Sequence, residues 1–230
     1  MDRTCTSVKE GYERWSRTYD HDPNPILALE ERHLKNTLPP VEGKRVLDLA
    51  CGTGRWLTHL VAAGATSGVG VDSSRAMLGV ANGKPAAQSR LVQADCGAIP
   101  FANGSFDLVV CSFALAHVLD LNRVAREVGR VAAARADVFV SDLHPQAYGH
   151  GWQTGFRDSL GAVQIATWSR SENEFLAPWV SIGFDCVQFV ACRFSEPERR
   201  VFAHAGKAGK FEEFCQLPAV LICHIQRSSS

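Results

Sequence analysis

Short apolar runs alternate along the chain with segments in which apolar residues recur every three or four positions. Five of these runs predict buried strands, and they cover residues 46–50, 69–72, 91–94, 108–111 and 138–142. The clearest helical spacing between them lies at residues 121–131. This alternation is typical of βαβ units, so it predicts an α/β fold with a parallel sheet and helices on both faces.

The last two long apolar runs, 184–194 and 217–225, suit an antiparallel strand pair at one edge of that sheet, after a predicted helix at 174–183. Two segments fall outside the alternation: 144–170 is rich in glycine and aromatic residues, and 195–216 is rich in charge. The first leaves the carboxyl end of a central strand, which is the edge where open α/β sheets bind ligands. We therefore expect 144–170 to be an active-site insertion.

Composition narrows the class of protein. With 230 residues and 46% hydrophobic content, one domain over 1–230 is expected. The formal net charge is zero and no run of five like charges appears, which argues against a nucleic-acid partner. No apolar stretch could span a bilayer and no secretory signal is apparent, so we expect a cytoplasmic protein. Eight cysteines without a Cys-x-x-Cys pair favour reduced thiols over a disulfide framework or a metal site.

The turn after the first strand holds two glycines, Gly52 and Gly54, and Asp48 precedes it on the strand. Glycine allows backbone to approach a small molecule closely, so the turn is a candidate cofactor cradle. A nicotinamide-binding turn needs Gly-x-Gly-x-x-Gly, but the third position counted from Gly52 is Leu57. The spacing therefore argues against a dinucleotide cofactor.

The segment instead resembles the Asp/Glu-x-Gly-x-Gly-x-Gly motif of class I S-adenosylmethionine (SAM) dependent methyltransferases, with Ala50 in place of the first glycine. Segments 68–72, 90–96 and 106–112 resemble the remaining cofactor motifs of that superfamily in the same order. The resemblance covers residues 12–145 well. It implies a Rossmann-like, seven-stranded, mostly parallel sheet with an antiparallel last strand, and SAM as the cofactor. The alternative is a glycine turn of some other α/β protein.

A SAM site needs groups for a ribose, an adenine and a methionine tail. Asp72 ends the second strand and could accept both ribose hydroxyls, or it could cap the next helix, and Ser73 follows it. The resemblance implies that Asp95 and the amide of Cys96 bind the adenine. Met77 and Ile99 would sandwich the ring, although core packing explains both equally well.

Two further residues are assigned to the methionine end of the cofactor. Asp48 is expected to order the glycine turn and to approach the methionine ammonium, and Ser112 is expected near the same tail. Tyr12 and Tyr19 lie in an N-terminal segment, about 1–25, that resembles a lid over the cofactor. Such a lid excludes water and fixes the approach of the acceptor. A helix that simply covers the sheet edge is the alternative.

Histidine is the natural base for an acceptor hydroxyl, because it titrates near neutral pH. His117 follows the fourth strand and His144 the fifth, so both are candidate catalytic residues. The aromatic residues of the insertion suit a small aromatic or anionic acceptor, or form a core of their own. They are Tyr148, Trp152, Phe156 and Trp168.

We therefore expect metal-independent transfer of a methyl group from SAM to a small-molecule acceptor, at oxygen. The Asn/Asp-Pro-Pro-Tyr motif is absent after the fourth strand, which argues against methylation of adenine in DNA. Methylation of RNA or protein remains an alternative, as does a non-catalytic SAM-binding partner protein. The acceptor and the oligomeric state depend on surfaces that motifs do not specify.

Overall fold

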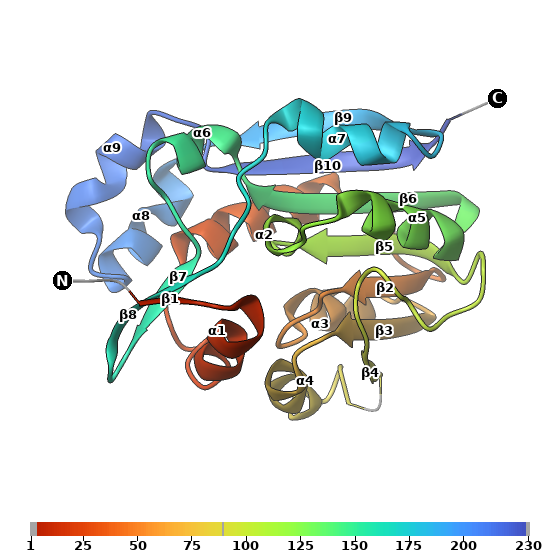
Figure 1. Ribbon diagram of the computed structural model, residues 1–230, viewed down its shortest axis with the longest axis horizontal. Helices are drawn as coiled ribbons and strands as arrows, with labels where there is room; N and C mark the ends of the chain where they lie inside the picture. Colours follow the sequence, from red (N-terminus) through yellow and green to blue (C-terminus); the bar gives the residue numbers. More distant parts are fainter. Residues whose placement is uncertain (1–3, 89, 229–230) are drawn as a thin grey trace.

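The computed structural model describes residues 4–88 and 90–228, and its centre is a seven-stranded sheet (Figure 1). The strands are β2 (Arg45–Leu49), β3 (Ser67–Asp72), β4 (Leu91–Gln93), β5 (Phe106–Ser112), β6 (Ala132–Leu143), β9 (Phe184–Cys192) and β10 (Val220–Arg227). Their spatial order is β4-β3-β2-β5-β6-β10-β9. The first five are parallel, and β10 runs antiparallel to both β6 and β9. The predicted sheet, with its antiparallel last strand, is confirmed.

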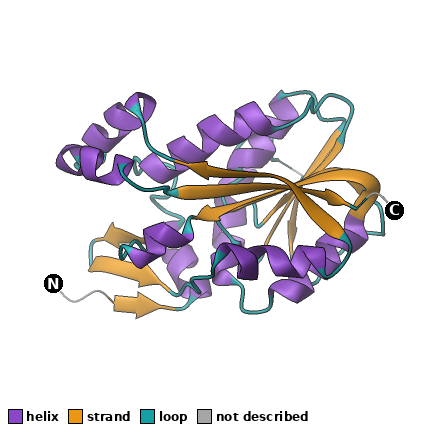
Figure 2. Cartoon of the chain, turned by 90° about the horizontal axis from the view of Figure 1, so that it is seen from above, coloured by secondary structure: helices purple, strands orange, loops and turns teal. Residues whose placement is uncertain are grey.

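Helices cover both faces of this sheet (Figure 2). One face is covered by α5 (Leu121–Val131) and α7 (Glu172–Val180). The other face carries α2 (Pro25–Thr37), α3 (Arg55–Ala62), α8 (Glu196–His204) and α9 (Phe211–Cys215). The predicted charged segment 195–216 therefore supplies two helices, whose phenylalanines pack into the core.

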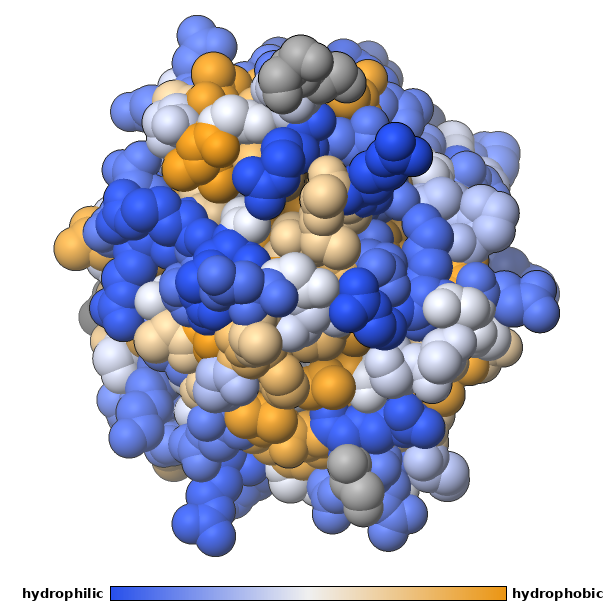
Figure 3. Space-filling model, turned by 90° about the vertical axis from the view of Figure 1, so that its right-hand side faces the viewer, coloured by the Kyte–Doolittle hydropathy of each residue, from blue (hydrophilic) through white to orange (hydrophobic). Residues whose placement is uncertain are grey.

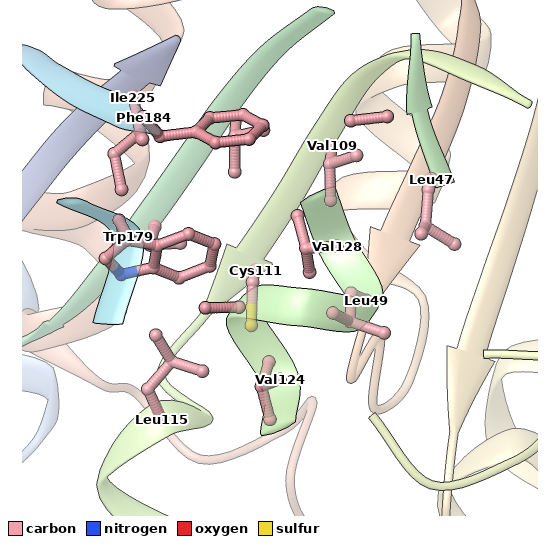
Figure 4. Packing of buried hydrophobic residues seen from close by; sticks show 14 of the residues in the cluster. Leu47, Leu49, Val109, Cys111, Leu115, Val124, Val128, Trp179, Phe184 and Ile225 are labelled. Atoms are coloured by element: carbon pink, nitrogen blue, oxygen red, sulfur yellow. The ribbon is translucent and has the colours of Figure 1, made fainter. Parts of the chain in front are cut away.

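Side chains alternate between the two faces along each strand, as a pleated backbone requires. Leu47 and Leu49 of β2 pack with Val124 and Val128 of α5 (Figure 4), whereas Val46 packs with α2 and α3 on the opposite face. Each fully buried aliphatic side chain contributes roughly 1.5–3 kcal/mol to folding. This core packing thereby fixes the positions of the residues that end the strands at the carboxyl edge of the sheet.

A second, three-stranded sheet lies beyond that edge and was not predicted. Its order is β1 (Thr4–Thr6), β8 (Gly161–Ile165) and β7 (Gly155–Asp158), with β1 parallel to β8. It joins the expected lid to the expected insertion, although the two are far apart in sequence. The first three residues of the lid segment 1–25 lie outside the described residues.

The lid helix α1 (Val8–Trp15) packs on this small sheet. Gly11 makes the approach possible, because a Cβ there would lie 2.7 Å from Cγ1 of Ile165. Arg14 of α1 and Asp158 of β7 form a salt bridge of 2.6 Å. The N-terminal segment and the insertion therefore form one packed unit.

The surface at the end of the molecule opposite the small sheet is mostly polar. Figure 3 shows that end, where hydrophilic side chains predominate and apolar ones form small separate areas. Among the described residues, we find no helix with the length and apolar character needed to cross a bilayer.

Candidate functional site

A cavity of about 440 Å³ opens at the carboxyl ends of β2, β3 and β5, beneath α1. Most of the residues predicted to bind the cofactor line it, together with one of the two candidate bases. They are Tyr12, Tyr19, Asp48, Ala50, Gly52, Asp72, Ser73, Met77, Asp95, Cys96, Ser112 and His117. Segments separated by as many as 105 residues in sequence thus converge on one cavity.

The turn between β2 and α3 has the backbone of a glycine turn throughout. Ala50, Gly52 and Gly54 have φ angles of 55°, 55° and 77°, all in the left-handed region. Within the described chain no atom lies within 4 Å of a Cβ built on Gly52, which lines the cavity. Gly52 therefore presents bare backbone to whatever occupies this space.

Gly54 has a packing role that was not predicted. It is absent from the described residues that line the cavity, and a Cβ there would lie 3.3 Å from Cβ of Ala81 in α4 (Arg75–Asn82). Gly54 therefore allows close packing of α3 against α4, and its predicted contact with a cofactor stays a prediction.

Two carboxylates fix the shape of the turn. Asp48 accepts a hydrogen bond from the N–H of Leu57 at 2.7 Å, near the start of α3, and burial raises the pKa of Asp48 to about 7. Asp72 accepts from the N–H groups of Gly52 and Ser74, each at 2.8 Å, and burial raises its pKa too. The cap of α4 is Ser74. Asp72 therefore braces the turn from the cavity wall and does not itself cap the helix.

The far end of the cavity holds Asp95, Cys96 and Met77. The side chain of Asp95 is largely exposed, and its Oδ1 accepts from the N–H of Gly97 at 2.8 Å. Ile99, the other half of the expected sandwich, is buried in the core with α5 and is not among the described residues lining the cavity. Core packing is therefore the correct interpretation of Ile99.

Two sets of contacts join the expected lid segment to the residues around the cavity. The hydroxyl of Tyr12 lies 2.9 Å from Nε2 of His117, and Nδ1 of His117 lies 2.8 Å from the carbonyl oxygen of Ala166. At the other end of the segment, Asp20 accepts from Thr53 of the glycine turn and pairs with Lys84, both at 2.7 Å. The lid is tied to both walls of the cavity.

The partners of His117 determine its tautomer. A carbonyl oxygen can only accept, so Nδ1 carries the proton and Nε2 accepts from the Tyr12 hydroxyl. Burial lowers the pKa of His117, and the hydrogen bond to Ala166 only partly offsets this. His117 is therefore a neutral imidazole whose basic nitrogen lies at the cavity wall.

His144 lies elsewhere. It is 2% exposed, it is the N-cap of α6 (Pro145–Gly149), and its Nδ1 accepts from the N–H of Gln146 at 3.2 Å. Its Nε2 lies 3.3 Å from Glu172, and it is missing from the described residues that line the cavity. The structure therefore shows His144 as the cap of α6, and its predicted role as a base gains no support from the described cavity lining.

Two of the aromatic residues of the insertion, Phe156 and Trp152, serve packing. Phe156 stacks on Trp15 of the lid, and Trp152 packs against Phe194 and Phe214 near α9. None of these residues is among the described cavity-lining residues. The insertion therefore supports the lid and the neighbouring core.

Among the cavity-lining residues that sequence reasoning missed are Phe113 and Arg55. Phe113 has a φ of 52°, which is strained for a bulky side chain, and it follows the last residue of β5. Arg55 follows Gly54, and its Nη2 donates to the fully buried Glu30 at 2.8 Å. Within the described chain, Nη1 of Arg55 has no hydrogen-bond partner. A buried acid on the otherwise apolar face of α2 was the signal that could have identified this pair.

The described residues contain no group of three or more His, Cys, Asp or Glu side chains arranged to hold a metal ion. The eight cysteines are free thiols, and burial raises the pKa of Cys96 to about 11 and of Cys192 to about 12.

Comparisons with known proteins agree with this geometry. A family model described as a methyltransferase domain matches residues 46–135. A demethylmenaquinone methyltransferase of Staphylococcus epidermidis is 33% identical over 129 residues, which are 52% of this chain and 53% of that protein. One of Clavibacter sepedonicus is 35% identical over 143 residues, covering 57% of this chain and 58% of the relative. The chain thus spans about half the length of the curated relatives it matches.

Solved structures extend the likeness to most of the chain. An S-adenosylmethionine dependent methyltransferase from Mesorhizobium loti aligns with a TM-score of 0.69 and 23% identity, over 89% of this chain and 100% of that one. At this identity the alignment shows a common fold.

Proposed function

Because the chain belongs to the class I S-adenosylmethionine-dependent methyltransferase superfamily, whose cofactor is SAM, we propose that it binds SAM in the cavity beneath α1 and methylates a small-molecule acceptor. The observation that carries the proposal is the convergence of the predicted cofactor residues of five chain segments on that one cavity. The likeness to small-molecule methyltransferases supports the acceptor class.

The residues of the cavity fit the ribose and the methionine tail of SAM. Gly52 offers bare backbone next to the carboxylate of Asp72, which suits a ribose edge. Arg55 lines the same cavity, and its positive charge suits the carboxylate of the methionine tail. Asp48, whose pKa is about 7, would balance the ammonium of the methionine tail once ionised.

SAM supplies a methyl group on a positively charged sulfur, which an acceptor atom displaces directly. The chain's part is to hold the two reactants in line, exclude water and remove a proton. Nε2 of neutral His117 would take the proton of an acceptor hydroxyl, after that hydroxyl replaces Tyr12 as its hydrogen-bond donor. The lid would exclude water while the acceptor is held. This assignment favours transfer to oxygen without a metal.

The test is methyl transfer itself. Protein is incubated with SAM carrying a tritiated methyl group and a panel of small phenols, quinols and carboxylic acids, and label is counted in the organic extract. The proposal predicts labelled product, and a loss of turnover of roughly 10²–10⁴-fold in His117→Gln with unchanged SAM affinity. Label found only in added RNA or protein would overturn the small-molecule acceptor. Binding of SAM without any transfer would overturn catalysis.

A further inference from the structure

A buried carboxylate near the end of β6 contacts the turn that carries His117. Asp142 is 4% exposed and is not among the described residues lining the cavity. Its Oδ2 accepts from the N–H of Ala116 at 2.8 Å, and its Oδ1 accepts from the N–H of Leu143 at 2.8 Å. A buried carboxylate needs such donors, and here one of them belongs to the residue before His117.

The segment after β8 holds the same turn through its carbonyl groups. The turn is a short 3₁₀ helix, η1 (Leu115–His117), which follows β5. The guanidinium of Arg170 donates to the carbonyl oxygens of Leu115 and Leu119, at 3.1 and 3.2 Å. Because both N–H and C=O groups of the turn have partners outside it, the position of His117 relative to β6 is fixed.

A proton taken up by His117 creates a positive charge in a place where burial disfavours it. Burial lowers the pKa of His117, and the negative charge of Asp142 acts in the opposite direction. Burial raises the pKa of Asp142, and the positive charge of His117 lowers it in turn. Each group therefore stabilises the charged form of the other, since Coulomb attraction is strong where water is scarce.

The other ionisable side chains around this pair do not replace Asp142. Burial raises the pKa values of Tyr12 on α1, Cys111 on β5 and Tyr148 on α6, so these groups are neutral at pH 7, and Arg170 is a cation. The cavity wall adds Lys9, Asp48 and Asp72. Of all these elements, it is β6 that presents a carboxylate to the backbone of the His117 turn.

We infer that Asp142 is a positioning residue that holds the turn carrying His117 and stabilises the imidazolium formed when His117 takes the acceptor's proton. The inference rests on the proposed methyl transfer. In that step the acceptor oxygen forms a bond to the methyl carbon, the electron pair of the carbon–sulfur bond stays on sulfur, and the hydroxyl proton passes to Nε2 of His117. Positive charge thus moves from sulfur to His117, beside whose backbone the carboxylate of Asp142 lies.

The variant Asp142→Asn separates charge from shape. Its side-chain oxygen can still accept from the N–H of Ala116, but the negative charge is lost. Nuclear magnetic resonance should show the His117 imidazole titrating roughly one pH unit lower in the variant than in wild type. Turnover should fall by up to about tenfold, while the dissociation constant for S-adenosylhomocysteine changes less than about twofold. An unchanged pKa of His117 would overturn the inference.

A matched control lies earlier on the same strand. Asp137 is 8% exposed, pairs with Lys44 at 2.7 Å and lies 2.9 Å from Nε2 of His224. Asp137→Asn should lower the free energy of unfolding and leave the titration of His117 unchanged. Equal shifts of the His117 pKa in the two variants would indicate a merely structural effect and overturn the inference.

A measurement that leaves Asp142 in place covers the case in which Asp142→Asn does not fold. In wild type, the carboxyl carbon resonance of Asp142 should show a step at the pH where His117 titrates. His117→Gln should lack that step. A carboxyl resonance that does not respond would contradict the inference, and so would an imidazole that stays neutral until acid unfolds the protein.

The outcomes separate this inference from the proposed function. If labelled product forms, but Asp142→Asn keeps the wild-type pKa of His117 and the wild-type turnover, the role of Asp142 fails and the proposed function stands. If no acceptor is labelled although Asp142→Asn lowers the pKa of His117, the proposed function fails, and the use of this pair in methyl transfer fails with it.

Discussion

Ala50 has a left-handed backbone, with φ of 55°, at the position where the superfamily motif has its first glycine. An alanine with a left-handed backbone lowers the free energy of unfolding by about 1–2 kcal/mol, so the shape of this turn reduces the stability of the protein. The geometry of the turn is therefore imposed by its surroundings, notably by Asp72, which accepts from the N–H of Gly52 within the turn, and Asp48, which accepts from the N–H of Leu57 beyond it.

Replacing Ala50 by glycine should relieve that strain. Glycine also raises the conformational entropy of the unfolded chain, which offsets roughly 0.4–1 kcal/mol of the relieved strain. Ala50→Gly should therefore raise the free energy of unfolding by up to about 1 kcal/mol. Ala114 also lines the cavity but has a φ of −118°, so Ala114→Gly should instead lower the free energy of unfolding. Urea denaturation measures both variants. Equal destabilisation of the two would contradict the strain at Ala50.

The lowered pKa of His117 determines the direction in which the free energy of unfolding changes with pH. The unfolded chain binds a proton at this histidine as pH falls through 6.5, its ordinary pKa, whereas the folded protein does so only at lower pH. The stability that neutral His117 contributes is therefore present above pH 6.5 and is lost as the pH falls below it.

Nuclear magnetic resonance can measure this titration directly, with His117→Gln assigning the resonance. The His117 imidazole should titrate below pH 6.5. The difference in unfolding free energy between wild type and His117→Gln should shrink between pH 7.5 and pH 5. A pKa at or above 6.5 would contradict the buried, neutral ring.

For individual residues, the sequence predicted which side chains lie at the ends of strands. It did not predict roles that depend on a residue that is close in space but distant in sequence. Asp72 and Ser112 could be located because parallel strands end at one edge. The packing of Gly54 against α4 and the capping of α6 by His144 could not be predicted, because they involve partners that spacing does not reveal. Arg55 was missed because its significance depends on Glu30, which is 25 residues away.

Among the elements, the lid helix α1 depends on a glycine for its position. Ile165 of β8 lies where a Cβ on Gly11 would be, so Gly11→Ala should push α1 away from the small sheet. Overpacking of this kind costs about 1–3 kcal/mol. If a closed lid contributes to binding, the dissociation constant for S-adenosylhomocysteine should rise several-fold.

Gly79 of α4 provides the matched control, since nothing in the described structure lies within 4 Å of a Cβ built there. Gly79→Ala should stabilise the protein by up to about 1 kcal/mol through helix propensity and leave affinity unchanged. If Gly11→Ala binds as tightly as wild type, α1 only covers the sheet edge and is not a lid.

The inner strands β2 and β5 and the second half of β6 could be predicted because each is a largely apolar run buried on both faces. The small sheet could not be predicted, because β1 and β8 are short and pair across most of the sequence. Aromatic residues of the insertion suggested an acceptor pocket, yet Phe156 stacks on Trp15 and so stabilises the lid. Composition alone could not distinguish those two roles.

On the scale of the whole molecule, the sheet brings strand ends together and the lid unit encloses them. The core clusters on the two faces fix β2, β3 and β5, so the cavity is formed largely by the rigid part of the fold. The lid unit adds Tyr12 and Tyr19 from above. A cavity formed mainly by core strands predicts a cofactor site that exists before the cofactor binds, and the separate N-terminal unit above it predicts a segment that closes the site.

The most direct test of the account is calorimetric titration of the purified protein with SAM and S-adenosylhomocysteine, beside Asp72→Ala. Wild type should bind both with micromolar affinity, and Asp72→Ala should weaken binding by about tenfold or more, because a carboxylate at the ribose edge is lost. Asp107→Ala, which removes a carboxylate paired with Arg45 at the opposite edge, should bind as wild type. Absence of binding to wild type, or equal affinity in Asp72→Ala, would contradict the cofactor site.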